Sequence, residues 1–187
     1  MHILDTLNQI HSLCPQSNQL LGELVQEQEL PKGYPLLHFG QVDLHLHYIV
    51  KGSGRVYYLR DGQDITDYIA IEGQFLGGVE SLFTRKPSHK AMEITEDSIV
   101  QSIVYDAFER LCQQHLDIAQ LGRKIAVFAF LECQRRIEDI RFLPAAERYR
   151  ELEKKYPGIS NRIPLKHLAS YLGITQVSLS RIRSGQQ

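Results

Sequence analysis

The sequence predicts an α+β fold in which an antiparallel sandwich or barrel of short strands has helices before and after it. Turn signals recur about every ten residues between Glu29 and Val104 and separate short runs rich in Val, Ile and Tyr. Apolar residues at helical spacing fill the segments on either side. With 187 residues, 43% hydrophobic and 23% charged, the chain suits one large globular domain or two small ones.

Residues 3–25 are expected to be helical, with an interruption at Pro15 because proline cannot donate a backbone hydrogen bond. Short strands are then expected, and Gly52 and Gly54 allow a tight turn between two of them. The expected strands are Tyr34–His38, Leu44–Lys51, Arg55–Leu59, Asp64–Ala70, Ser88–Ile94 and Ser98–Val104.

From Tyr105 to about Ile140 the pattern is helical again, with two apolar stripes. The first is Ile118, Leu121, Ile125 and Phe128, and the second is Ala126, Ala129, Cys133, Ile137 and Ile140. Two stripes indicate two faces to bury. One can pack on the strands, and the other predicts a partner helix, so we expect a homodimer. The alternative is a helix buried wholly inside one subunit.

Pro144 ends this helix, and a charged helix follows at about Ala145–Tyr156 until Pro157-Gly158 stops it. We therefore divide the chain into a strand domain with N-terminal helices at residues 1–115, a dimerisation helix at 116–140 and a C-terminal domain at 141–187.

Charge is distributed unevenly between these parts. Residues 1–139 carry 12 Lys and Arg against 19 Asp and Glu, whereas residues 140–187 carry 9 against 3. No acidic residue lies between Ile159 and Gln187. The asymmetry predicts that the C-terminal domain faces a polyanion.

Composition excludes several other classes. No apolar run approaches the ~20 residues of a membrane helix, and the N-terminus has no secretion signal pattern. The three cysteines, Cys14, Cys112 and Cys133, lie far apart and form no CxxC pair. We therefore expect a cytoplasmic protein with reduced thiols, no cofactor and no membrane contact.

Residues 165–183 carry the strongest functional pattern. They predict two short helices joined by a tight turn at Gly173, with small Ala169 where the helices cross and Thr175 at the N-cap of the second. This is the layout of a helix-turn-helix, whose second helix enters the DNA major groove. A purely structural helical hairpin is the alternative.

With these motifs in place, the whole chain resembles the Crp/Fnr family of bacterial transcription regulators, in the short form common among Bacteroidetes. The resemblance is carried by Lys51–Tyr57, Asp61-Gly62, Glu72–Gly78, Leu82-Phe83 and Leu168–Arg183. It implies a β-roll of cyclic-nucleotide-binding type, a long helix that pairs two subunits, and a C-terminal winged-helix-like domain. It also implies RNA polymerase as a partner.

The resemblance assigns DNA contacts to seven residues: Lys166, Thr175, Gln176, Val177, Ser178, Arg181 and Arg183. Gln176 and Arg181 have the side chains that pair with adenine and guanine, and Val177 can contact a thymine methyl. The other four residues are expected to contact phosphates. A two-fold symmetric dimer predicts a palindromic double-stranded operator.

The sensor half departs from members that bind cyclic AMP. In those members a Glu accepts a ribose hydroxyl, an Arg–Ser or Arg–Thr pair holds the cyclic phosphate, and a helix N-terminus adds N–H donors. Here Gly78 stands at the Glu position and Ser88-His89 at the Arg–Ser positions. We therefore expect no cyclic AMP binding. An unidentified small-molecule effector would lie against Gly77, Gly78, Val79, Ser88 and His89.

Two other interpretations remain. His45-Leu-His47 is reminiscent of cupin metalloenzymes, but no carboxylate follows at the needed place, so we expect no metal site. Walker loops, nucleophile elbows and HExxH are lacking, which favours a protein that is not an enzyme. The second alternative is a ligand-binding or interaction module with the same fold that lacks DNA binding.

Overall fold

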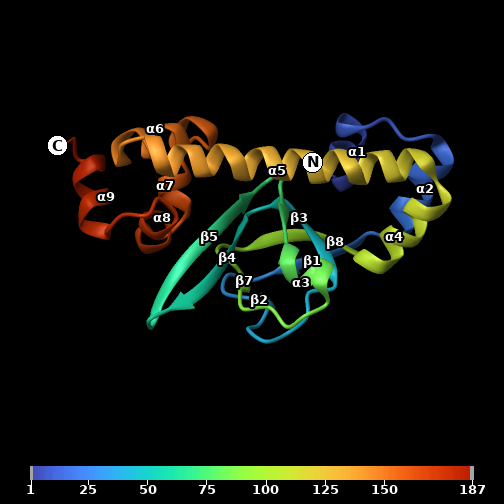
Figure 1. The fold of residues 1–187 in the computed structure, drawn as a ribbon, viewed down its shortest axis with the longest axis horizontal. Helices are drawn as coiled ribbons and strands as arrows, with labels where there is room; N and C mark the ends of the chain where they lie inside the picture. Colours follow the sequence, from blue (N-terminus) through green and yellow to red (C-terminus); the bar gives the residue numbers. More distant parts are fainter. Residues whose placement is uncertain (1, 186–187) are drawn as a thin grey trace.

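A computed structural model describes residues 2–185 (Figure 1). Two N-terminal helices, α1 (Ile3–Ile10) and α2 (Pro15–Leu24), precede the strands. The predicted interruption at Pro15 is confirmed, because Pro15 is the first residue of α2. The Cys14 sulfur caps this helix by accepting a hydrogen bond from the backbone N–H of Ser17.

Two four-stranded antiparallel sheets form the β-roll, with strand orders β1-β8-β3-β6 and β2-β7-β4-β5. The strands are β1 (Gln26–Leu30), β2 (Pro35–Leu37), β3 (His45–Lys51), β4 (Ser53–Arg60), β5 (Gln63–Ile71), β6 (Phe75–Leu76), β7 (Ala91–Ile94) and β8 (Ser98–Val104). The predicted α+β class with an antiparallel roll is confirmed.

The strand prediction needs two corrections. It omitted β1, whose first four residues are polar and exposed, and β6, which has only two residues. It also placed a strand at Ser88–Ile94, whereas the observed strand, β7, begins at Ala91. Ser88 instead belongs to the preceding loop, where its backbone exchanges hydrogen bonds with Gly40 and Gln41.

Alternation along β3 divides its side chains between two environments. Ile49 lies in the apolar core inside the roll, and His45 and His47 share its face because side chains two apart point the same way. Tyr48 points oppositely, into the core beneath α1, α2, α4 (Tyr105–Gln114) and the start of α5. The histidines are therefore directed toward the roll interior.

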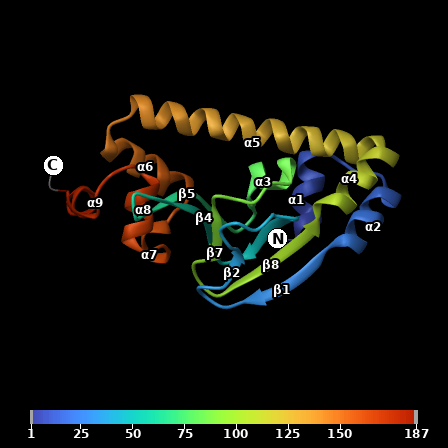
Figure 2. The ribbon, with the colours of Figure 1, turned by 60° about the horizontal axis from the view of Figure 1, so that its bottom comes forward.

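The long helix α5 (Leu116–Phe142) runs along most of the molecule and connects the β-roll to the C-terminal helices (Figures 1 and 2). Ile118 and Leu121 are fully buried at its beginning. Phe128, the last residue of the first predicted stripe, is 55% exposed. The apolar contacts of α5 with the N-terminal helices and α4 extend only as far as Ile125.

Four helices follow: α6 (Ala145–Lys155), α7 (Ile159–Arg162), α8 (Leu165–Tyr171) and α9 (Gln176–Arg183). Their apolar core includes Ile69 of β5, so they pack directly on the β-roll. The Ser170 hydroxyl of α8 accepts a hydrogen bond of 2.8 Å from the backbone N–H of Thr66. Within residues 2–185, no helix combines the length and apolar character needed to cross a membrane.

Candidate functional site

Helices α8 and α9 are held together by a local arrangement that the sequence specifies. Gly173 has φ +68, a left-handed conformation that favours glycine, and the N–H of Ile174 donates to the Ala169 carbonyl at 3.0 Å. Ala169 and Leu179 are buried where the helices meet. The predicted N-cap is confirmed, since the Thr175 hydroxyl accepts from the backbone N–H of Ser178 at 3.1 Å.

The outward surface of α9 is polar, basic and free of acids. Of the seven residues assigned to DNA contact, all are exposed except Ser178, which is half-buried: Lys166, Thr175, Gln176, Val177, Ser178, Arg181 and Arg183. Among the described residues, no acidic side chain forms an ion pair with Lys166, Arg181 or Arg183. Their charges remain available to an external anion.

Lys166 stands apart from the α9 residues. It lies in the first turn of α8, close enough to Asp64 of β5 to contribute to the lowered pKa of that carboxyl. Burial opposes ionisation of Asp64, and the hydrogen bonds and charge of Arg55 outweigh it, with smaller contributions from His167 and Lys166.

Arg162, another basic residue of the acid-free segment, is bound within the chain. Its guanidinium donates to Glu72 at 2.7 Å, to Glu96 at 2.6 Å and to the Gly52 carbonyl at 3.1 Å. These hydrogen bonds outweigh burial and raise the pKa of Arg162. Arg162, Glu72 and Glu96 thus join α7 to two turns of the β-roll.

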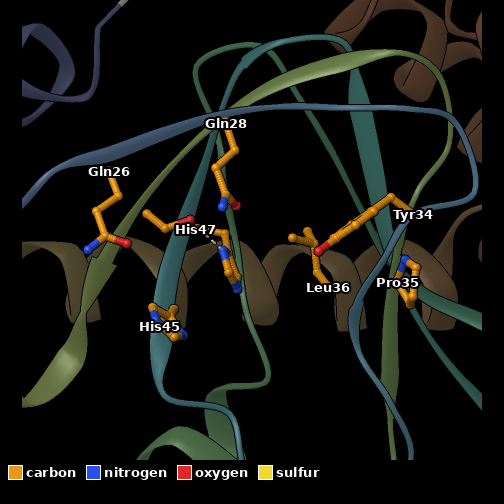
Figure 3. Close-up of a pocket in the computed structure, with 8 residues that line it drawn as sticks. Gln26, Gln28, Tyr34, Pro35, Leu36, His45 and His47 are labelled. Atoms are coloured by element: carbon orange, nitrogen blue, oxygen red, sulfur yellow. Dashed lines mark hydrogen bonds between the residues drawn. The ribbon is translucent and has the colours of Figure 1, made fainter.

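A pocket of about 220 Å³ opens into one end of the β-roll (Figure 3). It is lined by Gln26, Gln28, Tyr34, Pro35, Leu36, His45, His47 and Ser102. His47 Nδ1 is 2.7 Å from the Ser102 hydroxyl. Burial, with a smaller contribution from His45, outweighs Asp43 and lowers the pKa of His47 to about 4, so its imidazole is neutral at pH 7.

The N-terminus of the short helix α3 (Val79–Thr84) is occupied by a carboxylate from the same chain. The backbone N–H of Gly78 donates to Asp43 Oδ2 at 2.7 Å, and Asp43 is only 2% exposed. The Asp43 N–H donates in turn to the Ser81 hydroxyl at 3.0 Å. Asp43 therefore holds a carboxylate of the same chain beside the start of α3.

The residues assigned to ligand binding do not line the pocket: Gly77, Gly78, Val79, Ser88 and His89. The Val79 side chain is 62% exposed, and His89 faces solvent opposite Glu80. The Ser88 hydroxyl accepts from the backbone N–H of Lys90 at 3.0 Å. The pocket and the α3 turn are thus separate features.

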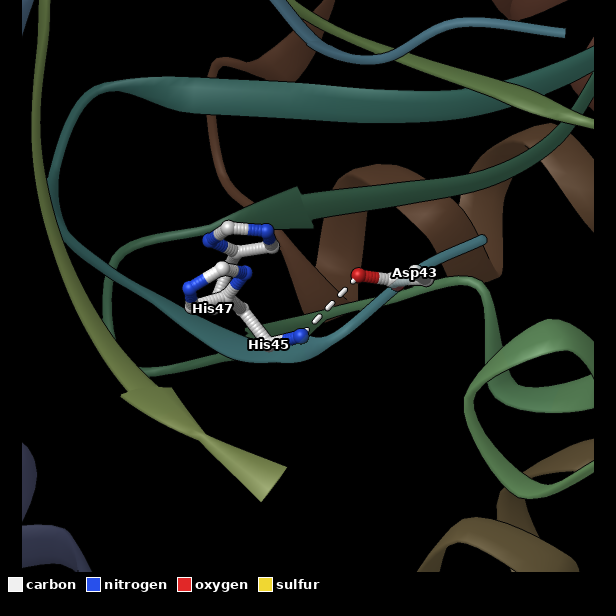
Figure 4. A group of neighbouring side chains, drawn as sticks. All are labelled: Asp43, His45 and His47. Atoms are coloured by element: carbon white, nitrogen blue, oxygen red, sulfur yellow. Dashed lines mark hydrogen bonds between the residues drawn. The ribbon is translucent and has the colours of Figure 1, made fainter. Parts of the chain in front are cut away.

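Sequence reasoning missed Asp43. Its carboxylate lies beside His45 and His47, and each of the three side chains offers a donor atom within 4.8 Å of the other two (Figure 4). The available signal was an acidic residue two positions before the HxH pair, whereas the cupin pattern directed attention to the positions after it.

Comparisons with known proteins agree with this architecture. Residues 27–115 match the family model described as a cyclic nucleotide-binding domain. No curated protein matches the chain. Solved structures do: FixK2 from Bradyrhizobium japonicum is 17% identical, with a TM-score of 0.71 over 86% of this chain and 83% of that one.

The regulator CLP from Xanthomonas campestris, described as c-di-GMP responsive, is 15% identical with a TM-score of 0.68 over 92% of this chain and 91% of its own. The catabolite activator protein of Thermus thermophilus is 19% identical with a TM-score of 0.58, over 96% and 85%. At these identities the similarity shows a shared fold.

Proposed function

We propose that this chain is a sequence-specific DNA-binding transcription regulator of Crp/Fnr type, that it acts as a homodimer, and that its sensor domain does not hold cyclic AMP. The observation that carries the proposal is the surface of α9, where Gln176, Arg181 and Arg183 are exposed without an acidic neighbour. The structures that share its fold include a protein named as a regulator and one named as an activator.

In this proposal α8 and α9 form the helix-turn-helix and α9 is the recognition helix. Side chains at the start of such a helix and one turn further on face base edges in the major groove. Gln176 has the amide that pairs with adenine, Arg181 the fork that pairs with guanine O6 and N7, and Val177 an apolar surface for a thymine methyl.

Phosphate contacts fix the position of the helix in the groove. Thr175 and Ser178 share a hydrogen bond of 2.9 Å between their hydroxyls, so one of the two hydroxyls is left to donate to a phosphate oxygen. Arg183 and Lys166 supply positive charge on either side of this pair. These contacts add affinity that depends on salt and carries no sequence information.

The exposed apolar side chains of α5 support dimerisation. They are between 47% and 73% exposed: Val127, Phe128, Phe130, Leu131, Ile137, Ile140 and Phe142. A helical surface of this kind is buried when a second copy packs alongside it. Two-fold symmetry then places two copies of α9 on a palindromic operator, with half-sites roughly 34 Å or a multiple of that apart.

The sensor domain is proposed to exclude cyclic AMP for an electrostatic reason. The Asp43 carboxylate already accepts from the Gly78 N–H, so a cyclic phosphate at that point would meet a negative charge. Ser88 and His89 stand where an arginine and its partner would hold the phosphate. An effector of different chemistry, and RNA polymerase, remain as proposed partners, and we propose no enzymatic activity.

The test is an electrophoretic mobility shift of the full chain on DNA from upstream of its own operon, against scrambled DNA of equal length. We expect a specific complex that Arg181→Ala weakens and Arg150→Ala, a change at an exposed arginine of α6, leaves intact. Equal binding to the two DNAs would refute sequence-specific recognition. A folded chain with no DNA binding would favour a ligand-binding or interaction module.

Calorimetry tests the sensor half separately. We expect no binding of cyclic AMP at micromolar concentration. A dissociation constant in the micromolar range or tighter would contradict the proposed role of Asp43 and Gly78.

A further inference from the structure

We propose that Asp43, His45 and His47 form a binding site for a divalent transition-metal ion at the inner wall of the β-roll. The inference goes beyond the proposed function and does not rest on DNA binding. Two imidazoles and one carboxylate make up a donor set suited to Zn²⁺, Fe²⁺ or Ni²⁺, and they leave coordination positions open for water or a small ligand.

The geometry brings the donors together from one short segment. His45 and His47 lie two residues apart on β3, so their rings share a face, with centroids 5.6 Å apart and planes at 27° (Figure 4). Asp43 comes from the turn just before β3, and the three donor atoms lie within 4.8 Å of one another. Bonds of about 2.0–2.2 Å to an ion require closer donors, so a small rotation of the half-exposed His45 ring completes the set.

Each of the two buried donors is already oriented by a neighbour. His47 Nδ1 is engaged by the Ser102 hydroxyl at 2.7 Å, which leaves Nε2 for an ion. Asp43 Oδ1 accepts from the His45 N–H at 3.1 Å, and Oδ2 accepts from Gly78. A carboxylate oxygen keeps a second lone pair after one such bond. Outer hydrogen bonds of this kind are typical of metal sites.

Charge provides an independent argument. Asp43 is 2% exposed, yet among residues 2–185 no Lys or Arg forms an ion pair with it. Buried charges in proteins are usually paired or coordinate metals. A divalent cation between Asp43 and the two histidines would supply the missing positive charge.

The adjoining pocket matches an ion better than a nucleotide. Its volume of about 220 Å³ is below the roughly 300–1,000 Å³ of typical small-molecule sites. His45 and His47 line it together with Gln28, whose amide is directed toward His47 in Figure 3. The open coordination positions would face polar groups that can hold a metal-bound water.

The test uses the full chain with any affinity tag removed and bound metal stripped by a chelator. Zn²⁺ is titrated against a chromogenic competitor. We expect one equivalent per chain with a dissociation constant of ~10⁻⁶ M or below. His45→Ala, a change at a half-exposed residue, should weaken binding at least tenfold, and Ser102→Ala should weaken it about 10- to 100-fold. His89→Ala, which removes an exposed histidine outside the site, should leave the affinity unchanged.

Co²⁺ absorption identifies the donors without any variant. A site built from two histidines and a carboxylate gives ligand-field bands without the thiolate charge-transfer band that cysteine ligands produce. No stoichiometric binding tighter than about 1 mM, an unchanged affinity in His45→Ala, or a thiolate band would each overturn the proposal. None of these outcomes bears on the mobility-shift test, so failure here and failure of DNA binding are distinguishable.

Discussion

The helices α9 and α3 both begin at a turn that could receive an anion, and their first turns are satisfied differently. At α9 the cap is the neutral hydroxyl of Thr175, and the next two residues, Gln176 and Val177, are exposed. At α3 the N-cap residue is Gly78, whose own N–H donates to the buried carboxylate of Asp43, 35 residues earlier in the chain. A neutral cap leaves the helix N-terminus attractive to phosphate, whereas a carboxylate beside a helix N-terminus opposes the approach of a second anion.

In the proposed function, this difference is the reason that the chain binds DNA and does not bind cyclic AMP. In α9, Arg181 and Arg183 lie in the last turn and form no ion pair with a described residue, which suits a polyanion. In the β-roll, the turn at Gly78 before α3 instead holds the Asp43 carboxylate of the same chain. Four changes, ordered by expected effect, test this comparison.

Removing the carboxylate should produce the largest effect. Asp43→Ala leaves the buried N–H of Gly78 and the part-buried N–H of His45 without acceptors, and each unsatisfied buried group costs about 1–3 kcal/mol. We expect a loss of about 2–4 kcal/mol in the free energy of unfolding, measured by urea denaturation in the presence of a chelator. Glu29→Ala, at an exposed position of β1, is the control, and an equal change in both variants would show that the hydrogen bonds of Asp43 do not stabilise the fold.

Arg181→Ala tests the proposed DNA-binding surface of α9. We expect a loss of ~1–3 kcal/mol in binding to the true operator, with relaxed preference at one base pair per half-site. Binding titrations on operator and scrambled DNA measure it. Equal losses on the two DNAs would mean that Arg181 contacts only phosphate.

The sequence predicted the turn between α8 and α9, but it did not predict the contact between Asp43 and Gly78. Gly173, Ala169 and Thr175 act within a few residues of one another, so their pattern is visible in the chain and the α8–α9 turn was predictable. Asp43 meets Gly78 only after β3 and β6 have paired, and nothing periodic marks that contact. Strand β1 was missed because its residues are polar, and it is held by pairing with β8.

Acid should lower the free energy of unfolding through two buried histidines, one in α8 and one in β3. Burial, with smaller contributions from Arg55 and Lys166, lowers the pKa of His167 in α8 to about 4, and His47 behaves similarly. The unfolded chain takes up these protons near the ordinary value of 6.5, whereas the folded chain does not. Stability is therefore complete above pH 6.5 and declines as the pH falls from 6.5 toward 4.

Hydrogen exchange at pH 7 and pH 5 separates the two contributions. We expect α8 and β3 to lose protection at pH 5, and His167→Gln to reduce the pH dependence at α8 only. A pH dependence at α8 that persists in this variant would exclude His167 as its source.

Lys166→Ala should have the smallest effect. Lys166 is expected to contact phosphate, so the variant should bind operator and scrambled DNA with equally reduced affinity. The slope of log affinity against log salt should fall in magnitude by about one. Anisotropy titrations at several salt concentrations measure the slope. Specificity that changes with Lys166→Ala would contradict a purely electrostatic role.

The central claim, that two copies of this chain join through α5 and place two α9 helices on DNA, is tested most directly by light scattering of the full chain with and without a palindromic duplex. We predict the mass of a dimer at micromolar concentration and a complex of two chains per duplex. A monomer whose mass DNA does not change, or a complex of one chain per duplex, would contradict the account.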